Sequence, residues 1–438
     1  MTRNTLAINL FSAVTLLTAT LSVQAENLVS MMDQALAADT RIKISEFDAE
    51  ITNEQDWQAL GRLLPQLSAY SQFSHNDRKD RASSESYLGE KYGVSLTQVI
   101  FNFDAFNGKI RTARVLDQAN YAVQDVIGTV LLDVTEKYLA VLGAHDGLAL
   151  VQAEKESVQS QLVQYEKLYE KGLIKITDLL DARVRRDTIL ADEIEQTNQL
   201  EVAREALVKM TGKPIGKLDR LNNQSVFPKV EGNAEDWIGK AQKTNPSLMA
   251  RRMSVLAAEA GARQAYGGYM PRVDLQLNYQ KSDIGFENSR TSQTDTGYVA
   301  LNVSLPLFDG GSNYFRTREA LTRIEMEQVR EEELLRELTR GTREAFLNAH
   351  SYERRIQASE RRLESAQKSH QAMKESFKYS AVTVVDVLNA LQAEFAARRD
   401  LQNAQYGYLL AWLQLHYLAG ELTPEQIHEM NRLLTPAS

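Results

Sequence analysis

The sequence of 438 residues contains no cysteine. This absence excludes disulfide bonds, thiolate metal sites, a cysteine nucleophile and a lipid-modified N-terminal cysteine. Basic residues are not in excess either, since 50 Lys and Arg stand against 58 Asp and Glu and give a net charge of −8. A nucleic-acid binder needs a basic patch or stripe, so no nucleic-acid partner is expected. The six histidines show no metal-binding spacing, and we predict neither a metal nor another cofactor.

Proline is scarce, and its eight copies leave two long stretches untouched. Residues 66–213 and 307–423 contain none. Because a proline inside a helix costs ~3 kcal/mol, both stretches can form very long helices. Within 105–171, apolar and aromatic side chains recur at steps of three and four from Leu131 to Tyr169, a narrow seam typical of a coiled coil. One helix over 105–171 would be ~100 Å long at 1.5 Å per residue.

Long apolar runs are also missing after the N-terminus. Residues 6–23 are predominantly apolar and follow Arg3, and VQA at 23–25 places small residues at the −3 and −1 positions before Glu26. This arrangement is typical of a secretory signal peptide over 1–25. The alternative, a buried N-terminal helix, would need a partner on every side, because the stretch is apolar all round. No later segment holds 18 consecutive apolar residues, so no transmembrane helix is expected.

Nearly the same phrase occurs twice, as IKITDLLDA at 174–182 and VTVVDVLNA at 382–390, an offset of 208 residues. Two further pairs follow at offsets of 206 and 207: LLPQLSAYSQF (63–73) with YMPRVDLQLNY (269–279), and LTQVIF (96–101) with VSLPLF (303–308). A nearly constant offset across three landmarks predicts that the chain is a duplication.

We therefore expect five segments: a signal peptide (1–25), a first repeat (26–220), a linker (221–234), a second repeat (235–422) and a C-terminal tail (423–438). Each repeat should contain a helix, two strands joined by a polar surface loop, and a long helical hairpin. The predicted loops are 74–91 and 281–297, and the predicted hairpin turns lie near 172–178 and 380–386.

The predicted strands alternate between apolar and polar residues, most clearly in VDLQLNYQ (273–280) and YVALNVSLPLF (298–308). This pattern suits either a half-buried soluble sheet or a transmembrane barrel. The export signal and the long polar loops favour the barrel. So do aromatic residues that bracket the strands as membrane-interface girdles would: Tyr92, Phe101, Tyr279, Tyr298 and Phe308.

The number of strands adds a constraint. One chain supplies four, whereas bacterial outer-membrane barrels need at least eight. An open four-stranded sheet would expose unpaired backbone groups to lipid, which is not tolerated. The barrel must therefore be shared between subunits, and the pattern alone permits two, three or more.

Together with KGLIKITDLLDAR (171–183) and VSLPLFDGG (303–311), these motifs resemble the TolC-like outer-membrane efflux and secretion channels over the whole mature chain. The resemblance implies a mainly α fold with a small β part. It consists of a long coiled-coil α-helical barrel plus four transmembrane β-strands per chain, within a shared 12-stranded trimeric β-barrel. It also implies a location in the outer membrane of a Gram-negative bacterium, spanning into the periplasm. The implied activity is non-enzymatic, that of a passive exit duct for type I secretion or efflux.

The resemblance further implies partners: a homotrimer, outer-membrane lipid, a periplasmic membrane-fusion adaptor and an inner-membrane ABC or proton-driven pump. Partners would open the periplasmic end by docking at the hairpin tips, which here contain Gly172, Leu173, Ser380 and Ala381. A periplasmic coiled-coil adaptor is the alternative function. It should carry a lipoyl-like or compact β domain between its helices, and none is visible in the sequence.

Family members place an acidic ring at the pore constriction and a second one three residues further on. The first position is Asp386 here, and the second is Asn389. Clustered carboxylates attract cations, so one ring instead of two predicts weaker cation selectivity. The alternative role of Asp386, and of Asp178 in the first repeat, is helix capping, because an aspartate at a helix start satisfies free backbone N–H groups. The two roles are compatible.

Family members also close this end with hydrogen bonds between the two hairpins. Thr177 and Asp178 match the acceptor side, but Val382 stands at the arginine donor position and Phe377 at the tyrosine donor position. Charge-assisted hydrogen bonds contribute about 1.5–3 kcal/mol each, so this polar latch is predicted to be largely missing. Three arginines are close enough in sequence to replace the donors: Arg183, Arg185 and Arg186.

Overall fold

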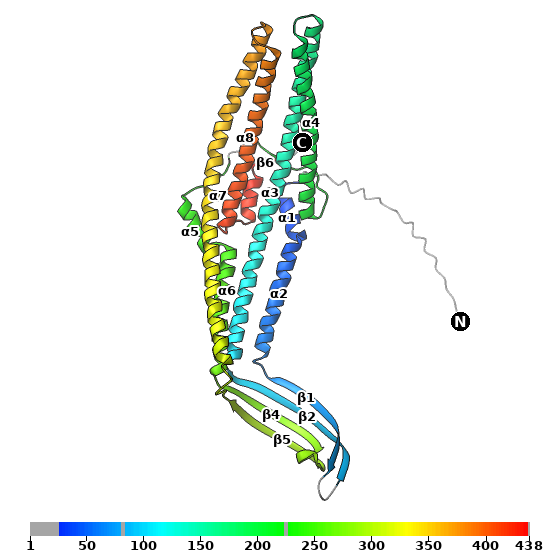
Figure 1. Cartoon of the computed structure of the whole chain (residues 1–438), viewed down its shortest axis with the longest axis vertical. Helices are drawn as coiled ribbons and strands as arrows, with labels where there is room; N and C mark the ends of the chain where they lie inside the picture. Colours follow the sequence, from blue (N-terminus) through cyan, green and yellow to red (C-terminus); the bar gives the residue numbers. More distant parts are fainter. Residues whose placement is uncertain (1–25, 80–83, 223–226, 437–438) are drawn as a thin grey trace, which may run out of the picture.

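The computed structural model describes residues 26–79, 84–222 and 227–436, which form a long helical rod with a β-sheet at one end (Figure 1). The predicted signal peptide lies outside the described residues. The helices are α1 (Leu28–Ala38), α2 (Thr40–Gly61), α3 (Phe103–Glu170), α4 (Ile176–Thr211), α5 (Ala234–Thr244), α6 (Pro246–Tyr266), α7 (Ser312–Lys378), α8 (Val384–Leu418) and α9 (Pro424–Asn431). The strands are β1 (Gln66–Lys79), β2 (Ser84–Asn102), β3 (Arg220–Leu221), β4 (Arg272–Ile284), β5 (Arg290–Ser304) and β6 (Leu434–Thr435).

The two halves of the chain run through the same order of elements. The first passes through α2, β1, β2, α3 and α4, and the second through α6, β4, β5, α7 and α8. The proline-free stretches contain the two longest helices, α3 with 68 residues and α7 with 67. Asn102 caps the start of α3 by accepting a hydrogen bond from the amide of Ala105 at 3.1 Å.

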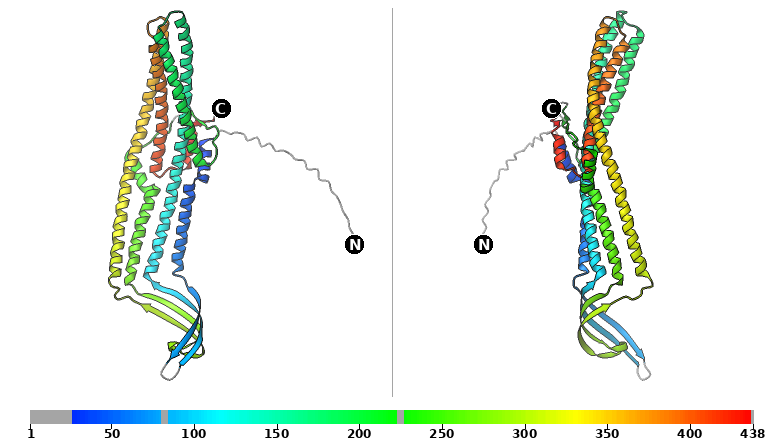
Figure 2. Two further views of the ribbon diagram at one scale, coloured as in Figure 1. Left: turned by 45° about the vertical axis from the view of Figure 1, so that its right-hand side comes forward. Right: turned by 90° about the vertical axis from the view of Figure 1, so that its left-hand side faces the viewer.

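Near the sheet, α2, α3, α6 and α7 lie side by side in one layer (Figure 1). Further along, α4 folds back on α3 and α8 folds back on α7, so the rod ends in two hairpins. At mid-height α1 and α9 pack together against the rod, and Figure 2 shows these short helices on one side of it. The largest buried apolar cluster gathers there, with Leu28 from α1, Tyr138 from α3, Leu413 from α8 and Met430 from α9.

The expected C-terminal tail contains a helix and a short strand. Thr423 and Gln426 form a capping box that starts α9, whose Ile427 and Met430 are buried. Strand β6 then pairs with β3, so the tail closes onto the expected linker. The segment 424–431 is too short to show a clear helical pattern of apolar residues in the sequence. The helix forms because burial against the rest of the fold stabilises it.

The main sheet is antiparallel in the order β1-β2-β4-β5. The expected loops are too long, because pairing continues to Lys79 opposite Ser84 and to Ile284 opposite Arg290. Backbone hydrogen bonds alone define a ladder, and a stretch with polar side chains on both faces still pairs. Within the described chain, β1 and β5 each have one edge without a strand partner. The described helices include no candidate membrane span.

Candidate functional site

The two hairpin turns at the far end of the rod have matching backbone geometry. Gly172 has φ 68° and Ser380 has φ 55°, so both occupy the left-handed region. In the first turn the amide of Leu173 donates to the carbonyl of Leu168 at 2.9 Å, and in the second the amide of Ala381 donates to a carbonyl in α7 at 3.2 Å. All four predicted docking residues lie exposed in these turns.

Asp386 and Asp178 each stand third in a helix, not before it as a simple cap would. The Asp386 carboxylate accepts from the Thr383 hydroxyl at 2.7 Å and from the Thr383 amide at 2.8 Å. These bonds, the hydroxyl first, hold the pKa of Asp386 below its usual value. Asp178 accepts from the amide of Lys175 at 3.4 Å. Asp386 thus caps α8 firmly and keeps an exposed negative charge. Asn389, three residues further on, is also exposed but carries no charge.

The side chain of Phe377 lies between the hairpins. Its ring meets Tyr165 of α3 edge-on, with centroids 5.6 Å apart and planes at 80°. Burial raises the pKa of the Tyr165 phenol to about 12. Both rings belong to an apolar cluster that joins all four helices, which we call the tip cluster: Leu162, Tyr165, Leu168, Ile174, Leu179, Ala182, Phe377, Val384 and Leu388.

Within the described residues, no hydrogen bond or ion pair joins Thr177 or Asp178 to the second hairpin. Thr177 is exposed and Val382 is half-buried. The polar latch is therefore absent from this arrangement, and apolar contact occupies the same end of the molecule.

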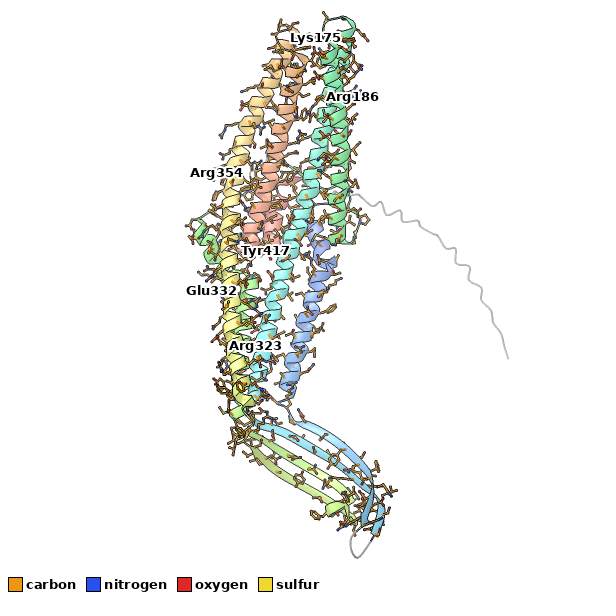
Figure 3. All side chains as sticks on the ribbon, in the orientation of Figure 1. Lys175, Arg186, Arg323, Glu332, Arg354 and Tyr417 are labelled. Atoms are coloured by element: carbon orange, nitrogen blue, oxygen red, sulfur yellow. The ribbon has the colours of Figure 1, made fainter. Side chains whose placement is uncertain are left out.

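Of the three candidate arginines, Arg183 pairs with Glu166 on α3 at 3.4 Å and Arg186 pairs with its neighbour Asp187 at 2.7 Å. Both pairs stay within the first hairpin; Figure 3 shows Arg186 on α4 below the turn. Arg185 contacts Glu154 of α3. Only Arg185 reaches a group that also binds the second hairpin.

That group, Glu154, was missed by the sequence reasoning. Its side chain is 2% exposed, and its second oxygen lies 3.4 Å from Arg399 of α8. We call Arg185, Glu154 and Arg399 the buried triad after its carboxylate, since the side chains of Arg185 and Arg399 are 18% and 37% exposed. It lies roughly 25 Å from the first turn, at 1.5 Å per residue, amid Val151, Val158 and Phe395. The available signal was a carboxylate at a seam position, three residues after Val151 and four before Val158.

The second hairpin has its own buried carboxylate. Glu394 of α8 is 8% exposed, accepts from Nδ1 of His370 on α7 at 2.7 Å, and pairs with Arg398 at 2.5 Å. All three residues lie within the same hairpin. This carboxylate therefore joins α7 to α8 and does not join the hairpins to each other.

At the opposite end, the sheet has one apolar face. A register shift between Val99 and Phe101 pairs Phe101 with Val273, so that its side chain lies on the apolar face. Tyr92 pairs with Lys281 and Val94 pairs with Tyr279. Residues two apart in a strand share a face, so both tyrosines lie on the apolar face. Large side chains exposed on it include Leu67, Phe73, Val94, Leu277, Val299, Leu301 and Val303.

Tyr298 departs from the expected girdle. It pairs with Asn278, on the polar face of the sheet. Phe308 lies beyond the end of β5 and is 88% exposed, near the helical rod. The bulge after Val99 could not be foreseen from alternation, since an inserted residue reverses the facing of everything beyond it.

The architecture matches known proteins. The profile of the outer membrane efflux protein family matches residues 31–213 and 237–421. Outer membrane protein TolC of Escherichia coli is 29% identical over 94% of this chain and 86% of its own. The alkaline protease secretion protein AprF of Pseudomonas aeruginosa is 28% identical over 86% of this chain and 82% of its own.

The crystal structure of CusC has a TM-score of 0.81 at 18% identity, covering 90% of this chain and 92% of that one. VceC of Vibrio cholerae has a TM-score of 0.79 at 16% identity, over 90% and 96%. The predicted fold, long antiparallel helices with a four-stranded antiparallel sheet, is thereby confirmed. The chain belongs to the outer membrane efflux protein family and is a TolC-like outer-membrane channel of type I secretion and efflux systems, not an enzyme.

Proposed function

We propose that three copies of the chain assemble into one continuous exit duct, with their sheets closed into a 12-stranded barrel. The observation that carries this proposal is the pair of open edges on β1 and β5 of a sheet with an apolar face. In lipid, every backbone N–H and C=O must be paired, so β5 of one copy pairs with β1 of the next. Three copies are the number that the family resemblance implies.

The helical layer supports the same assembly. Its outer members, α2 and α7, are connected in the chain to the outer strands β1 and β5 (Figure 1). Both expose large apolar side chains: Ile44, Phe47, Ile51 and Trp57 on α2, and Phe315, Leu321, Met326 and Val329 on α7. When β5 meets the next copy's β1, α7 meets the next copy's α2, and both apolar faces leave water.

The apolar face of the sheet has the height of a membrane. Tyr92 and Phe101 are nine residues apart on β2, or about 30 Å along the strand at 3.3 Å per residue. With the usual tilt of 35–45°, this corresponds to about 23 Å, close to the apolar band of about 25 Å in outer-membrane barrels. In our proposal Phe101 marks the periplasmic interface, and Tyr92 with Tyr279 marks the outer one.

At the periplasmic end, the duct closes by bringing the hairpins together around the axis. Three Asp386 carboxylates form the single acidic ring of the constriction, with Asn389 beside them. The tip cluster and the buried triad hold the two hairpins of each copy in place of the polar latch. A membrane-fusion adaptor and an inner-membrane pump engage the exposed turns around Leu173 and Ser380.

The assembly is tested by native mass spectrometry of the detergent-extracted protein and by its migration with and without heating. We expect an outer-membrane species three times the chain mass that heating converts to monomer. A monomer or dimer in mild detergent would contradict the trimer. Deletion of the gene, followed by assays of secreted proteins and drug sensitivity, identifies the cargo.

A further inference from the structure

A groove of about 650 Å³ runs between α3, α6 and α7 at the sheet end of the helical layer. Its floor consists of small residues, mainly from α6: Ser254, Ala257, Ala258, Gly261, Ala265 and Gly268. Longer side chains of α3 and α7 line the groove beside these short ones, together with Arg251 and Gln264 of α6 and Arg272 of β4. The volume falls within the range of about 300–1,000 Å³ that is usual for small-molecule sites.

The walls carry an excess of positive charge. Six arginines line the groove, against the three carboxylates Asp104, Glu319 and Glu327. The arginines are Arg111, Arg251, Arg272, Arg316, Arg323 and Arg330. In a chain whose net charge is −8, the groove is therefore a local site of the opposite sign. Figure 3 shows Arg323 on the side of α7 that faces α6.

The carboxylates do not neutralise all of these guanidinium groups. Glu327 lies 3.1 Å from Arg251 and 2.7 Å from Arg330, and Glu319 lies 3.0 Å from Arg323. At the sheet end, Asp104 lies 3.7 Å from Arg272. These contacts engage four of the six arginines.

The other two arginines have no carboxylate partner in the described chain. Arg111 donates to the neutral side-chain oxygen of Gln264 at 3.0 Å. Arg316 makes no hydrogen bond or ion pair with the described residues. Both arginines lie within about 12 Å of the starts of their helices at Phe103 and Ser312, at 1.5 Å per residue, and these are the helix ends nearer the sheet.

We propose that this groove binds a phosphate ester, with Arg111 and Arg316 as the phosphate ligands. A guanidinium group donates two parallel hydrogen bonds to phosphate oxygens, and Arg111 and Arg316 line the groove from α3 and α7, the two helices that flank α6. The alanine floor suits the carbon skeleton of the ester. Solvated arginines on a plain helix face would explain the charge, but not the hollow between the walls.

Two sources supply this chemistry. One is a phospholipid headgroup, since the groove adjoins the sheet that the proposed function places in the membrane. The other is a soluble phosphate ester that reaches the rod from the periplasm or the duct. The soluble case does not depend on the barrel, so it can be tested whatever the oligomeric state proves to be.

The test uses the full-length protein in a neutral detergent. Isothermal titration with sn-glycerol 3-phosphate measures the soluble source, and native mass spectrometry after addition of phosphatidylglycerol measures the lipid source. The test variant is Arg111→Ala/Arg316→Ala. The matched control is Arg336→Ala/Arg340→Ala, which removes the same charge from exposed positions on α7 whose arginines pair with Glu332 and Glu344.

We expect the test variant to weaken binding at least tenfold and the control to leave it within twofold, with unchanged melting temperature and oligomeric state. Glu319→Gln releases Arg323 and should tighten binding severalfold without disturbing the fold, because this carboxylate is exposed. Binding of both probes indicates the soluble ester, and retention of phosphatidylglycerol alone indicates the headgroup. The proposal is overturned if neither probe binds, or if the control variant loses as much affinity as the test variant.

Discussion

The two helical hairpins occupy matching places in the two halves of the chain, yet they use their buried carboxylates differently. Glu154 of the first hairpin lies between Arg185 of its own hairpin and Arg399 of the other. Glu394 of the second has both partners, His370 and Arg398, inside its own hairpin. The second hairpin can therefore move as a unit without breaking its own charge pairs. Separation of the first hairpin from the second breaks the contact between Glu154 and Arg399.

The tips differ in the same sense. Asp386 is held by two short bonds from Thr383, whereas Asp178 accepts one long bond from Lys175. The turn of the first hairpin uses glycine in the left-handed region, and that of the second uses serine. The first hairpin thus has the less strained turn, and the second has the better capped helix.

Removing the carboxylate of the buried triad should have the largest effect. Glu154→Gln leaves two guanidinium groups facing a neutral amide, and breaking a buried ion pair costs about 3–5 kcal/mol. We expect a loss of unfolding free energy of about 3 kcal/mol, measured by thermal unfolding, together with a higher resting conductance in planar bilayers.

The matched control is Glu394→Gln, which breaks the buried pairs inside the second hairpin. It should destabilise the protein to a similar degree but leave the resting conductance unchanged. If both variants raise the conductance equally, Glu154 has no particular role in joining the hairpins.

Shortening the aromatic contact of the tip cluster should come next. Phe377→Ala removes a half-buried ring that lies against Tyr165. We expect a loss of about 2 kcal/mol, less than the 3–5 kcal/mol of a fully buried phenylalanine, and an easier opening of the channel. Tyr165→Phe keeps both rings and should change the conductance little. If Phe377→Ala leaves the resting conductance at the value of the unmodified protein, the tip cluster is not needed for closure.

Exchanging the turn residues should have a smaller effect, of opposite sign at the two tips. Ser380→Gly relieves a left-handed serine and should stabilise by about 1 kcal/mol, whereas Gly172→Ser should destabilise by about 1 kcal/mol. A Cβ at Gly172 would meet nothing within 4 Å, so the cost is confined to the backbone. Chemical denaturation of the two variants measures the difference, and equal signs would contradict the strain argument.

Neutralising the acidic ring should change selectivity more than stability. Asp386→Asn should abolish most of the cation preference measured by reversal potentials in bilayers, and Asp178→Asn should not. Because the pKa of Asp386 in the fold lies below the ordinary 3.8, its charge persists above about pH 4. Its contribution to stability is likewise present above the unfolded value and is lost as the pH falls through the lower folded pKa. A cation preference that survives in Asp386→Asn would assign it to another group.

Much of the helical part could be predicted from local signals. The proline-free stretches and the narrow apolar seams anticipated α3 and α7, since local hydrogen bonds and side-chain spacing largely decide where a long helix forms. The strand ends were harder. Their polar side chains carry no alternation, and the bulge before Phe101 reverses the facing of the side chains beyond it.

The sites divide in the same way. The chain by itself determined the turns and the aspartates at the helix starts, because these depend on residue type at local positions. The resemblance to the family added that Phe377 and Val382 stand at the donor positions of the polar latch. Only the tertiary structure decided what replaces that latch. Glu154 and Arg399 are 245 residues apart, and Tyr165 and Phe377 are 212 apart. A helix pattern records which face is apolar, but it does not record which distant residue meets that face, and a buried charge is stable only where that partner is found.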